Sequence, residues 1–581
     1  MKEIEEWYNR GKKAAKARKP MSMYARELGN IPEETVRVAR AACPKGTLAM
    51  RLRDELGELY QDEHFISLYP VEGQPAYEPW RLALVTVLQY GEGLTDRQSA
   101  NAVRERIDWK YALGLELTDP GFDFSILSEF RQRLVEGKSE TLLLDRLLEV
   151  CKQRGWLKAG GKQRTDSTHV LARVRSLSNL ECVGETLRAA LDDLAALAPE
   201  WLVQQITPDW FERYSHRIEN YRLPKAENQR LALAQQIGED GWHLLQALER
   251  PEAPEELKKI ESVQLLRQIW QQYYDLSGGK AKWRAGPQAI EDEGIIRSPY
   301  DPEARTGKKR DTTWFGYKVH LTETCALEGA EDTQARPLPQ LIVEVETTVA
   351  HVQDVETTQT IQENLAQHDL LPQEQIVDTG YVDADLLVSS KETYGITLLG
   401  PALPDTSWQA KAGKGFDVGS FHLDWQAQQA ICPQGQTSQS FRPAGERIEV
   451  VFPKETCAGC PVRSDCTKSA TTGRVLHVRP QVAHEALQTR RQEQETPAFR
   501  QAYQTRAGIE GTLSQAVRGM GMRRARYDGL HKTHLEHVLT AVAINLVRID
   551  AVLTHTPRGK TRRSNFTRLA LHPRFQSQAA A

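Results

Sequence analysis

The stretch 312–324, TTWFGYKVHLTET, constrains the fold more than any other part of the sequence. Trp314, Lys318 and His320 occupy one set of alternate positions there, and the other set contains mainly aromatic and aliphatic residues. A period of two over such a length is typical of a β-strand with one buried face. A second strand, LIVEVETT, is predicted from Leu341 onward. The chain is therefore expected to build a sheet around these two segments.

Three more strands are predicted, in GGKQRTDSTHVLARV, EQIVDTGYVDADLL and GITLLGPAL, and most of the remaining chain has helical patterning. The predicted fold class is α/β, a mixed sheet with flanking helices, preceded by an all-helical N-terminal domain and interrupted by a helical insert and a Cys-rich insert. The expected boundaries are 1–150 for the N-terminal domain, a candidate for DNA binding, 160–175, 291–404 and 490–553 for the core, 176–290 for the helical insert, 405–489 for the Cys-rich insert and 554–581 for a basic flexible tail.

Composition excludes several classes. The 581 residues are 40% hydrophobic and 26% charged, an ordinary globular balance that needs more than one domain. No apolar run approaches the roughly 20 residues that span a bilayer. The N-terminus lacks the apolar core of a secretory signal. Eight cysteines in this length are too few for a disulfide scaffold, which favours a cytoplasmic location.

The net charge of −3 hides an uneven distribution. Residues 500–532 hold seven Lys/Arg against two Asp/Glu, and the first twenty residues hold seven against three. Residues 181–261 instead hold nine against sixteen. Basic patches of this kind are typical of nucleic-acid-binding proteins, although solvated helix faces give the same pattern.

Three acidic residues stand at strand ends or on a predicted helix, far apart in the chain. Asp166 lies in the first predicted strand, and Asp378 ends an apolar strand before a glycine turn. Tyr503, Arg506 and Glu510 follow one another at offsets of three and four, so they are expected to share one helix face. Two-metal phosphoryl chemistry needs converging carboxylates that hold two ions roughly 4 Å apart. Oxygen ligands of this kind suit Mg²⁺ or Mn²⁺.

RTDSTHV, IVDTGYVDADL and YQTRAGIEGTLSQ, in this order, resemble the catalytic motifs of bacterial insertion-sequence DDE transposases. The last resembles the Tyr-x2-Arg-x3-Glu-x6-Lys signature of the cut-and-paste group. SPYDPEARTGKKRDTTWFGYKVHLTET and RRARYDGLHKTHLEHVLTAVAINLVRI resemble one subgroup closely, the eleven-eighty-two insertion-sequence family. The resemblance extends over residues 73–548, most of the chain.

The resemblance implies an RNase H-like core with Asp166, Asp378 and Glu510 as the metal-binding triad. It also implies DNA contacts by Tyr503 and Arg506. The signature's lysine is missing, because Val517 occupies its place. The basic residues that follow are candidates to replace it or to extend the DNA track: Arg518, Arg523, Arg524 and Arg526.

The implied activity is Mg²⁺-dependent hydrolysis at transposon ends and transfer of the resulting 3′-OH to target DNA. The implied partners are double-stranded DNA, as terminal inverted repeats and as target, and a second copy of the chain on paired ends. The implied setting is the bacterial cytoplasm, at the nucleoid. Two alternatives stay open: a catalytically inactive, transposase-derived DNA-binding protein, and an RNase H-like nuclease that cuts without joining.

Four cysteines form a separate candidate site. The segment CAGCPVRSDC places Cys457, Cys460 and Cys466 close together, and Cys432 lies upstream. Four thiolates suit a structural Zn²⁺, whereas a distant cysteine before C-x2-C-x5-C also resembles an iron–sulfur clasp. Zinc, a cluster and no metal remain alternatives.

The N-terminal helices and the insert carry two weaker hypotheses. Short helices bearing Arg104, Arg106, Arg131 and Arg133 fit either a helix-turn-helix-like DNA module or plain helical packing. In the helical insert, Trp210 and Trp242 are candidates to hold a flipped base, with burial between helices as the alternative.

Overall fold

The computed structural model describes residues 23, 29–57, 59–73, 75–290, 294–325, 338–469, 471–556 and 564–569. The basic segment 1–20 and most of the tail 554–581, both singled out from the sequence, lie outside these ranges. Within them, no helix is both long enough and apolar enough to cross a membrane.

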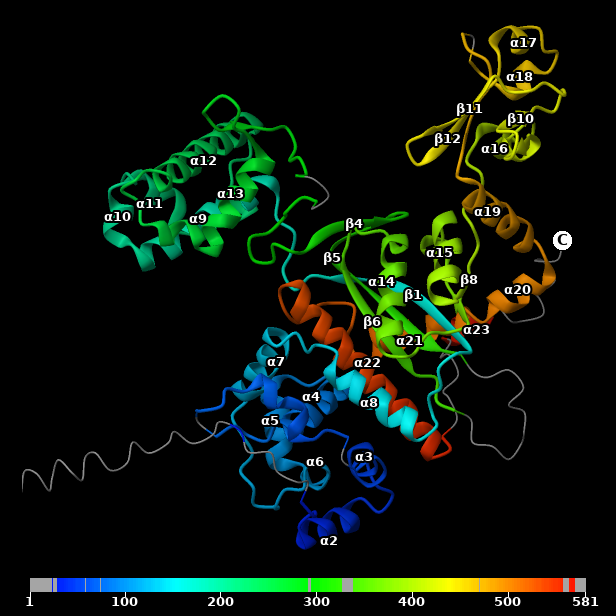
Figure 1. Ribbon diagram of the computed structural model, residues 1–581. Coiled ribbons are helices and arrows are strands. Elements are labelled where there is room, and N and C mark those ends of the chain that lie inside the picture. Colours follow the sequence, from blue (N-terminus) through cyan, green and yellow to red (C-terminus); the bar gives the residue numbers. More distant parts are fainter. Residues whose placement is uncertain are drawn as a thin grey trace, which may run out of the picture.

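A six-stranded mixed sheet forms the centre of the molecule (Figure 1). Its long strand β5 coincides with the alternating stretch 312–324, so that prediction is confirmed. β5 pairs with β1 and with β6 along nearly the same residues, 316–324 and 317–323, and its first residues, 312–316, pair with β4; these pairings are all antiparallel. β1, β7 and β8 run parallel. The strands are β1 (Lys162–Leu171), β4 (Arg305–Lys309), β5 (Thr312–Thr324), β6 (Ile342–Val349), β7 (Glu374–Ile376) and β8 (Thr397–Leu399).

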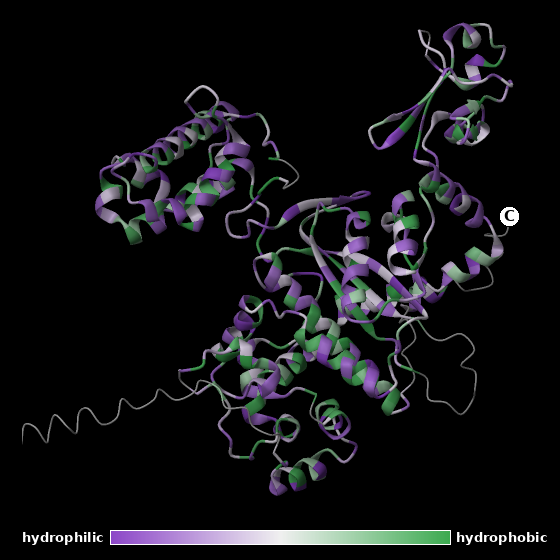
Figure 2. Ribbon diagram, in the orientation of Figure 1, coloured by the Kyte–Doolittle hydropathy of each residue, from purple (hydrophilic) through white to green (hydrophobic). Residues whose placement is uncertain are grey.

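Helices cover both faces of the sheet. α14 (Asp354–Gln367) packs on β6 and α15 (Ala384–Tyr394) packs beside β8. α21 (Ala507–Gly519) packs on β1 and α22 (Leu530–Leu553) on β6. The middle of α22 is hydrophobic (Figure 2) and buried, which explains why a helix of this length lies between the sheet and the N-terminal helices. The prediction of a mixed α/β fold is confirmed at this level.

The N-terminal helices pack against α22 and share one hydrophobic core with the sheet. α4 and α8 make the contact, and Arg131 anchors it: its guanidinium is buried, donates to Asp96 Oδ2 at 2.6 Å and lies over the ring of Tyr527. The helices are α2 (Glu33–Ala42), α3 (Leu48–Leu56), α4 (Pro79–Glu92), α5 (Asp96–Glu105), α6 (Ile107–Leu113), α7 (Ser125–Glu136) and α8 (Leu142–Gln153).

A second helical unit, green in Figure 1, stands to one side of the sheet and has its own hydrophobic core. Trp210 is buried in this core, and Trp242 donates its indole N–H to Gly279 O at 2.9 Å. Both tryptophans therefore take part in packing. The main elements are α9 (Asn179–Leu197), α10 (Pro199–Val203), α11 (Asp209–Tyr214), α12 (Glu227–Leu248), α13 (Glu261–Tyr273), β2 (Tyr274–Asp275) and β3 (Lys282–Trp283).

The Cys-rich segment is more regular than its loop-rich sequence indicates. Residues 440–478 form a three-stranded antiparallel sheet over a small core that contains Phe421 and Phe452. The elements are α16 (Trp408–Ala412), β9 (His422–Asp424), β10 (Gln429–Ile431), β11 (Ser440–Ala444), β12 (Arg447–Val451), α17 (Lys454–Ala458), α18 (Arg463–Cys466) and β13 (Val475–Val478). α19 (Gln481–Glu493) and α20 (Pro497–Gln504) lead from it back to α21.

Candidate active site

Asp166 lies on β1, and Asp378 lies just after β7, the neighbouring parallel strand. Asp166 is a buried residue of β1, and its Oδ1 accepts from the backbone N–H of Ser167 at 2.8 Å. Asp378 follows β7 and caps the short 3-10 helix η5 (Thr379–Tyr381) by accepting from Gly380 N at 2.8 Å. Burial raises the pKa of Asp378, and the charge of Asp166 raises it further. The two carboxylates are therefore electrostatic neighbours, although 212 positions separate them in the sequence (378 − 166).

Glu510 reaches the same place from α21. Arg506 joins it to the sheet: Nη1 donates to Asp166 Oδ2 at 2.7 Å, and Nη2 donates to Glu510 Oε1 at 3.2 Å. The Arg506 guanidinium also lies 5.9 Å from the ring centre of Tyr503. Glu510 itself is open to solvent, with a side chain 64% exposed. A charged ligand can thus approach Glu510 directly.

Tyr503, Arg506 and Glu510 do not lie on one continuous helix, which corrects the expectation from their spacing. α20 ends at Gln504, Arg506 is the N-cap residue of α21, and Glu510 lies in the first turn of that helix. At this junction the carbonyl of Thr505 accepts a hydrogen bond from Arg164 Nη1 at 2.8 Å, which ties it to β1. The three side chains remain neighbours across the junction.

A buried ionic cluster fixes this junction to the sheet. Glu323 on β5 accepts from Arg164 on β1 at 2.7 Å, from Thr512 on α21 at 2.6 Å and from Arg548 on α22 at 2.7 Å. Gly508 leaves room for it, since a Cβ there would stand 1.9 Å from Arg164 Nη1. The position of Glu510 therefore depends on contacts made two residues away on its own helix and on three other elements.

A fourth carboxylate, Asp354, stands at the start of α14 and was missed from the sequence. Its Oδ2 accepts from Ser167 Oγ at 3.2 Å, and its Oδ1 accepts from Lys318 Nζ at 2.9 Å. Burial alone would raise the pKa of Asp354, but the nearby positive groups, Lys318 among them, hold it below its ordinary value. The sequence around Asp354 is that of an ordinary helix start, so it carried no signal for this role.

The arginines predicted to contact DNA differ in their surroundings. Arg518 and Arg524 are exposed. Arg523 is half-buried and donates to His169 O at 2.6 Å, and Arg526 lies over the ring of Tyr90 and donates to Leu94 O at 3.2 Å. Arg523 and Arg526 therefore link elements of the fold, whereas Arg518 and Arg524 extend into solvent.

The arginines of the short N-terminal helices are also engaged within the protein. Arg104 donates to Pro120 O at 2.9 Å, and Arg106 pairs with Asp108 at 2.8 Å and with Glu92. Arg133 lies over the ring of Tyr69. These contacts show that the arginines take part in packing, while the DNA-binding role of this domain stays a prediction.

The four candidate cysteines surround one small cavity of about 40 Å³. Backbone N–H groups of Gln436 and Arg474 approach the sulfurs of Cys432 and Cys457 at 3.4 and 3.5 Å. Burial raises the pKa of the Cys466 thiol. Cys460 lines the same cavity. The chain thus gathers four sulfurs from segments up to 34 positions apart (466 − 432).

Neither the carboxylates nor the four cysteines are arranged as a complete metal-binding site. Among the described residues, no group of three or more His, Cys, Asp or Glu side chains is placed to hold a metal ion. At the sheet edge Arg506 stands between Asp166 and Glu510. The donor chemistry nevertheless fits metal binding: oxygen ligands at the sheet edge suit Mg²⁺ or Mn²⁺, and four sulfurs suit zinc or an iron–sulfur cluster.

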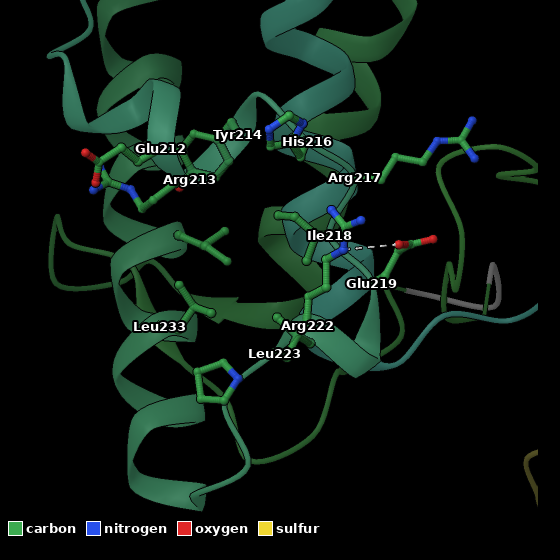
Figure 3. A pocket seen from close by; sticks show the side chains of 12 residues that line it. Glu212, Arg213, Tyr214, His216, Arg217, Ile218, Glu219, Arg222, Leu223 and Leu233 are labelled. Atoms are coloured by element: carbon green, nitrogen blue, oxygen red, sulfur yellow. Dashed lines mark ion pairs between the residues drawn. The ribbon is translucent and has the colours of Figure 1, made fainter.

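A separate cavity of about 280 Å³ lies in the second helical unit, between the chain after α11 and the helix α12 (Figure 3). Its floor is apolar, with Leu223 and Leu233, and its rim is basic. The rim arginines are largely neutralised within the unit: Arg213 pairs with Asp240 at 2.9 Å and Arg222 with Glu219 at 3.6 Å. This cavity contains none of the candidate catalytic residues.

Two family models match the chain. One, described as "Transposase DDE domain", matches residues 431–550, and the other, "Transposase domain (DUF772)", matches residues 39–133. The first range contains Tyr503, Arg506, Glu510 and the four cysteines, while Asp166 and Asp378 lie outside both. Searches of curated proteins and of solved structures gave no match.

The two matches support a transposase function, and this function implies DNA binding and, in the DDE family generally, divalent metal ions such as Mg²⁺. Together they indicate that the chain is similar to insertion-sequence DDE transposases.

Proposed function

We propose that the protein hydrolyses DNA at transposon ends and transfers the resulting 3′-OH into target DNA, with Asp166, Asp378 and Glu510 as its carboxylate triad. One observation carries the proposal: three segments far apart in sequence bring these acids to one edge of the sheet, where Arg506 bonds two of them. The strand order β6–β5–β1–β7–β8, antiparallel on one side of β1 and parallel on the other, supports an RNase H-like core.

The residues of the chain divide the work by position. Asp166 and Asp378 are held by strands and by hydrogen bonds from backbone N–H groups, so their oxygens are preorganised. Mg²⁺ or Mn²⁺ bound there would neutralise developing phosphate charge and activate a water or a 3′-OH. Glu510 is the third carboxylate of the proposed triad and lies on its solvent-exposed side. Arg506, which pairs with Asp166 and Glu510, is proposed to contact a DNA phosphate together with Tyr503.

DNA is proposed to enter over the exposed side of α21. Arg518 and Arg524 face solvent there and are available for phosphates, while Arg523 and Arg526 shape the surface on which the DNA lies. Backbone contacts of this kind set affinity and register and carry no sequence information. A dimer on paired ends follows from the reaction, because two ends are joined to one target.

The test is a cleavage assay on linear DNA that carries the terminal inverted repeats flanking the gene. With Mg²⁺ the purified protein is expected to nick at the repeat and to join the 3′ end to a target plasmid. Binding without nicking would identify an inactive DNA-binding protein. Nicking without joined product would identify a nuclease. Equal cutting of DNA that lacks the repeats would contradict the proposed substrate.

We also propose that Cys432, Cys457, Cys460 and Cys466 hold a structural Zn²⁺, with an iron–sulfur cluster as the second candidate. The support is the shared cavity and the N–H groups aimed at two of the sulfurs, since such contacts favour the thiolate form that binds metal. The site lies in the Cys-rich unit, on a different sheet from the triad. Its role is therefore to stabilise that unit.

Elemental analysis of the purified protein is expected to give about one zinc per chain. Cys460→Ser is expected to lose that metal and to lower the melting temperature of the Cys-rich unit. Cys43→Ser, at a cysteine far from the cavity, is the matched control and should retain it. Iron together with visible absorption would identify the site as an iron–sulfur cluster instead of a zinc site. A protein free of both metals would contradict the proposal.

A further inference from the structure

We infer that Lys309, at the end of β4, supplies the DNA-phosphate-contacting cation that the transposase signature places seven residues after the glutamate, where this chain has Val517. The inference rests on the proposed function and adds one residue to it. It begins from a gap in the sequence: α21 carries Glu510 but no lysine at the expected turn.

Lys309 stands beside the carboxylates although it comes from a distant part of the chain. Its Nζ lies 3.8 Å from Asp354 Oδ2. Lys309 pairs with Thr312 across the β4–β5 hairpin, so it faces the same side of the sheet as Lys318 and His320 on β5. In Figure 1 this hairpin lies at the top of the sheet, next to α14, which begins with Asp354.

The two lysines near Asp354 are in different situations. Lys318 is 13% exposed, and its ammonium donates hydrogen bonds to Asp354 Oδ1 and to the carbonyl of Val352. Lys309 is 56% exposed and makes a single long ion pair, which is weak at a solvated position. Lys309 can therefore leave Asp354 for a phosphate, whereas Lys318 serves to hold Asp354.

Lys309 lies near the candidate metal carboxylates by way of Asp354. The Asp354 Oδ2 that Lys309 approaches also accepts from the hydroxyl of Ser167 at 3.2 Å, and Ser167 is the neighbour of Asp166 on β1. On α21, by contrast, Val517 is half-buried and uncharged. Arg518, the nearest arginine on α21, is about 100° further around the helix. Among the described residues, Lys309 thus combines exposure, length and proximity to the carboxylates.

The test compares Lys309→Ala, Lys309→Arg and a matched control, Lys308→Ala, in binding and nicking of the same end DNA. Lys308 is the adjacent exposed lysine, and its side chain points to the opposite face of the hairpin. Lys309→Ala is expected to slow nicking at saturating DNA by about 10- to 100-fold. The slope of log K against log salt should fall by about 0.9, the value of one phosphate contact. Lys309→Arg should retain most of both, and Lys308→Ala should nick within about twofold of the parent.

The salt slope separates a phosphate contact from a structural role, because lost packing does not change the number of released counterions. If Lys309→Ala leaves both the slope and the nicking rate unchanged while Arg518→Ala reduces them, the inference is overturned in favour of Arg518. Equal losses in Lys308→Ala and Lys309→Ala would also overturn it. In either case the parent protein still nicks, so the proposed function survives; a parent that never nicks would instead remove the proposed function itself.

Discussion

Replacement of Glu510 by glutamine is expected to lower the rate of Mg²⁺-dependent nicking of end DNA by about 1,000-fold or more. Glutamine keeps the size of the side chain and removes one negative charge from the set formed with Asp166 and Asp378. A loss of this size equals about 4 kcal/mol of transition-state stabilisation, in the range expected when a bound metal ion loses a carboxylate ligand. Single-turnover nicking of labelled DNA measures it.

DNA affinity should survive the same change. Glu510 is exposed, and on the proposed DNA path the removal of its negative charge should leave phosphate binding equal or slightly tighter. The matched control is Glu495→Gln. Glu495 is an exposed glutamate that, like Glu510, follows the Cys-rich unit in the sequence, and it pairs with Arg500. Nicking by Glu510→Gln at the rate of the parent would remove Glu510 from the triad.

The strands could be predicted because their signal is local. The thirteen residues of β5 alternate between an apolar face and a face with Lys318 and His320, and this pattern needs no knowledge of partners. Asp378 was also predictable, since a carboxylate between an apolar run and a glycine marks a strand end followed by a turn. The mixed α/β fold follows from such local signals.

The parts that escaped prediction depend on contacts between distant residues. Asp354 begins an ordinary helix, and only the fold brings Ser167 and Lys318 to its two oxygens. The contact at the junction of α20 and α21 is likewise invisible in YQTRAGIEG, because the donor to the Thr505 carbonyl is Arg164, 341 positions earlier. Spacing alone placed Tyr503, Arg506 and Glu510 together for the wrong geometric reason, a single helix.

The contrast between local signals and long-range contacts also explains why the roles of the arginines after α21 could not be told apart from the sequence. A basic run after α21 predicts a DNA-binding surface, but sequence does not distinguish an arginine in solvent from one that links two elements. Arg526 lies over Tyr90 of the N-terminal helices, and Arg523 bonds the strand that carries Asp166. Substitutions at these two positions should therefore disturb the fold as well as DNA binding, whereas substitutions of Arg518 and Arg524 should act on DNA binding alone.

Replacement of Glu323 by alanine is expected to destabilise the core by about 3–5 kcal/mol. Glu323 is fully buried and, among the described residues, is the only carboxylate paired with Arg164 and Arg548. The side chains of Arg164 and Arg548 are 7% and 14% exposed. Its removal leaves two buried cations without a counter-charge, which costs more than the lost hydrogen bonds. Chemical unfolding of the core, compared with the parent under the same conditions, measures the difference in free energy.

Two further variants separate the charge from the contact. Glu323→Gln keeps a hydrogen-bond acceptor for Thr512 but loses the charge, so its unfolding free energy should fall between those of the parent and Glu323→Ala. Asp385→Ala, at an exposed carboxylate paired with Arg479, should change stability by less than about 1 kcal/mol. Because Thr512 lies one half-turn after Glu510 on α21, Glu323→Ala should also increase hydrogen exchange in that helix and reduce nicking at temperatures where the core is still folded. If the core tolerates Glu323→Ala as well as Asp385→Ala, the buried cluster does not hold α21, and the position of Glu510 must be fixed by Arg506 alone.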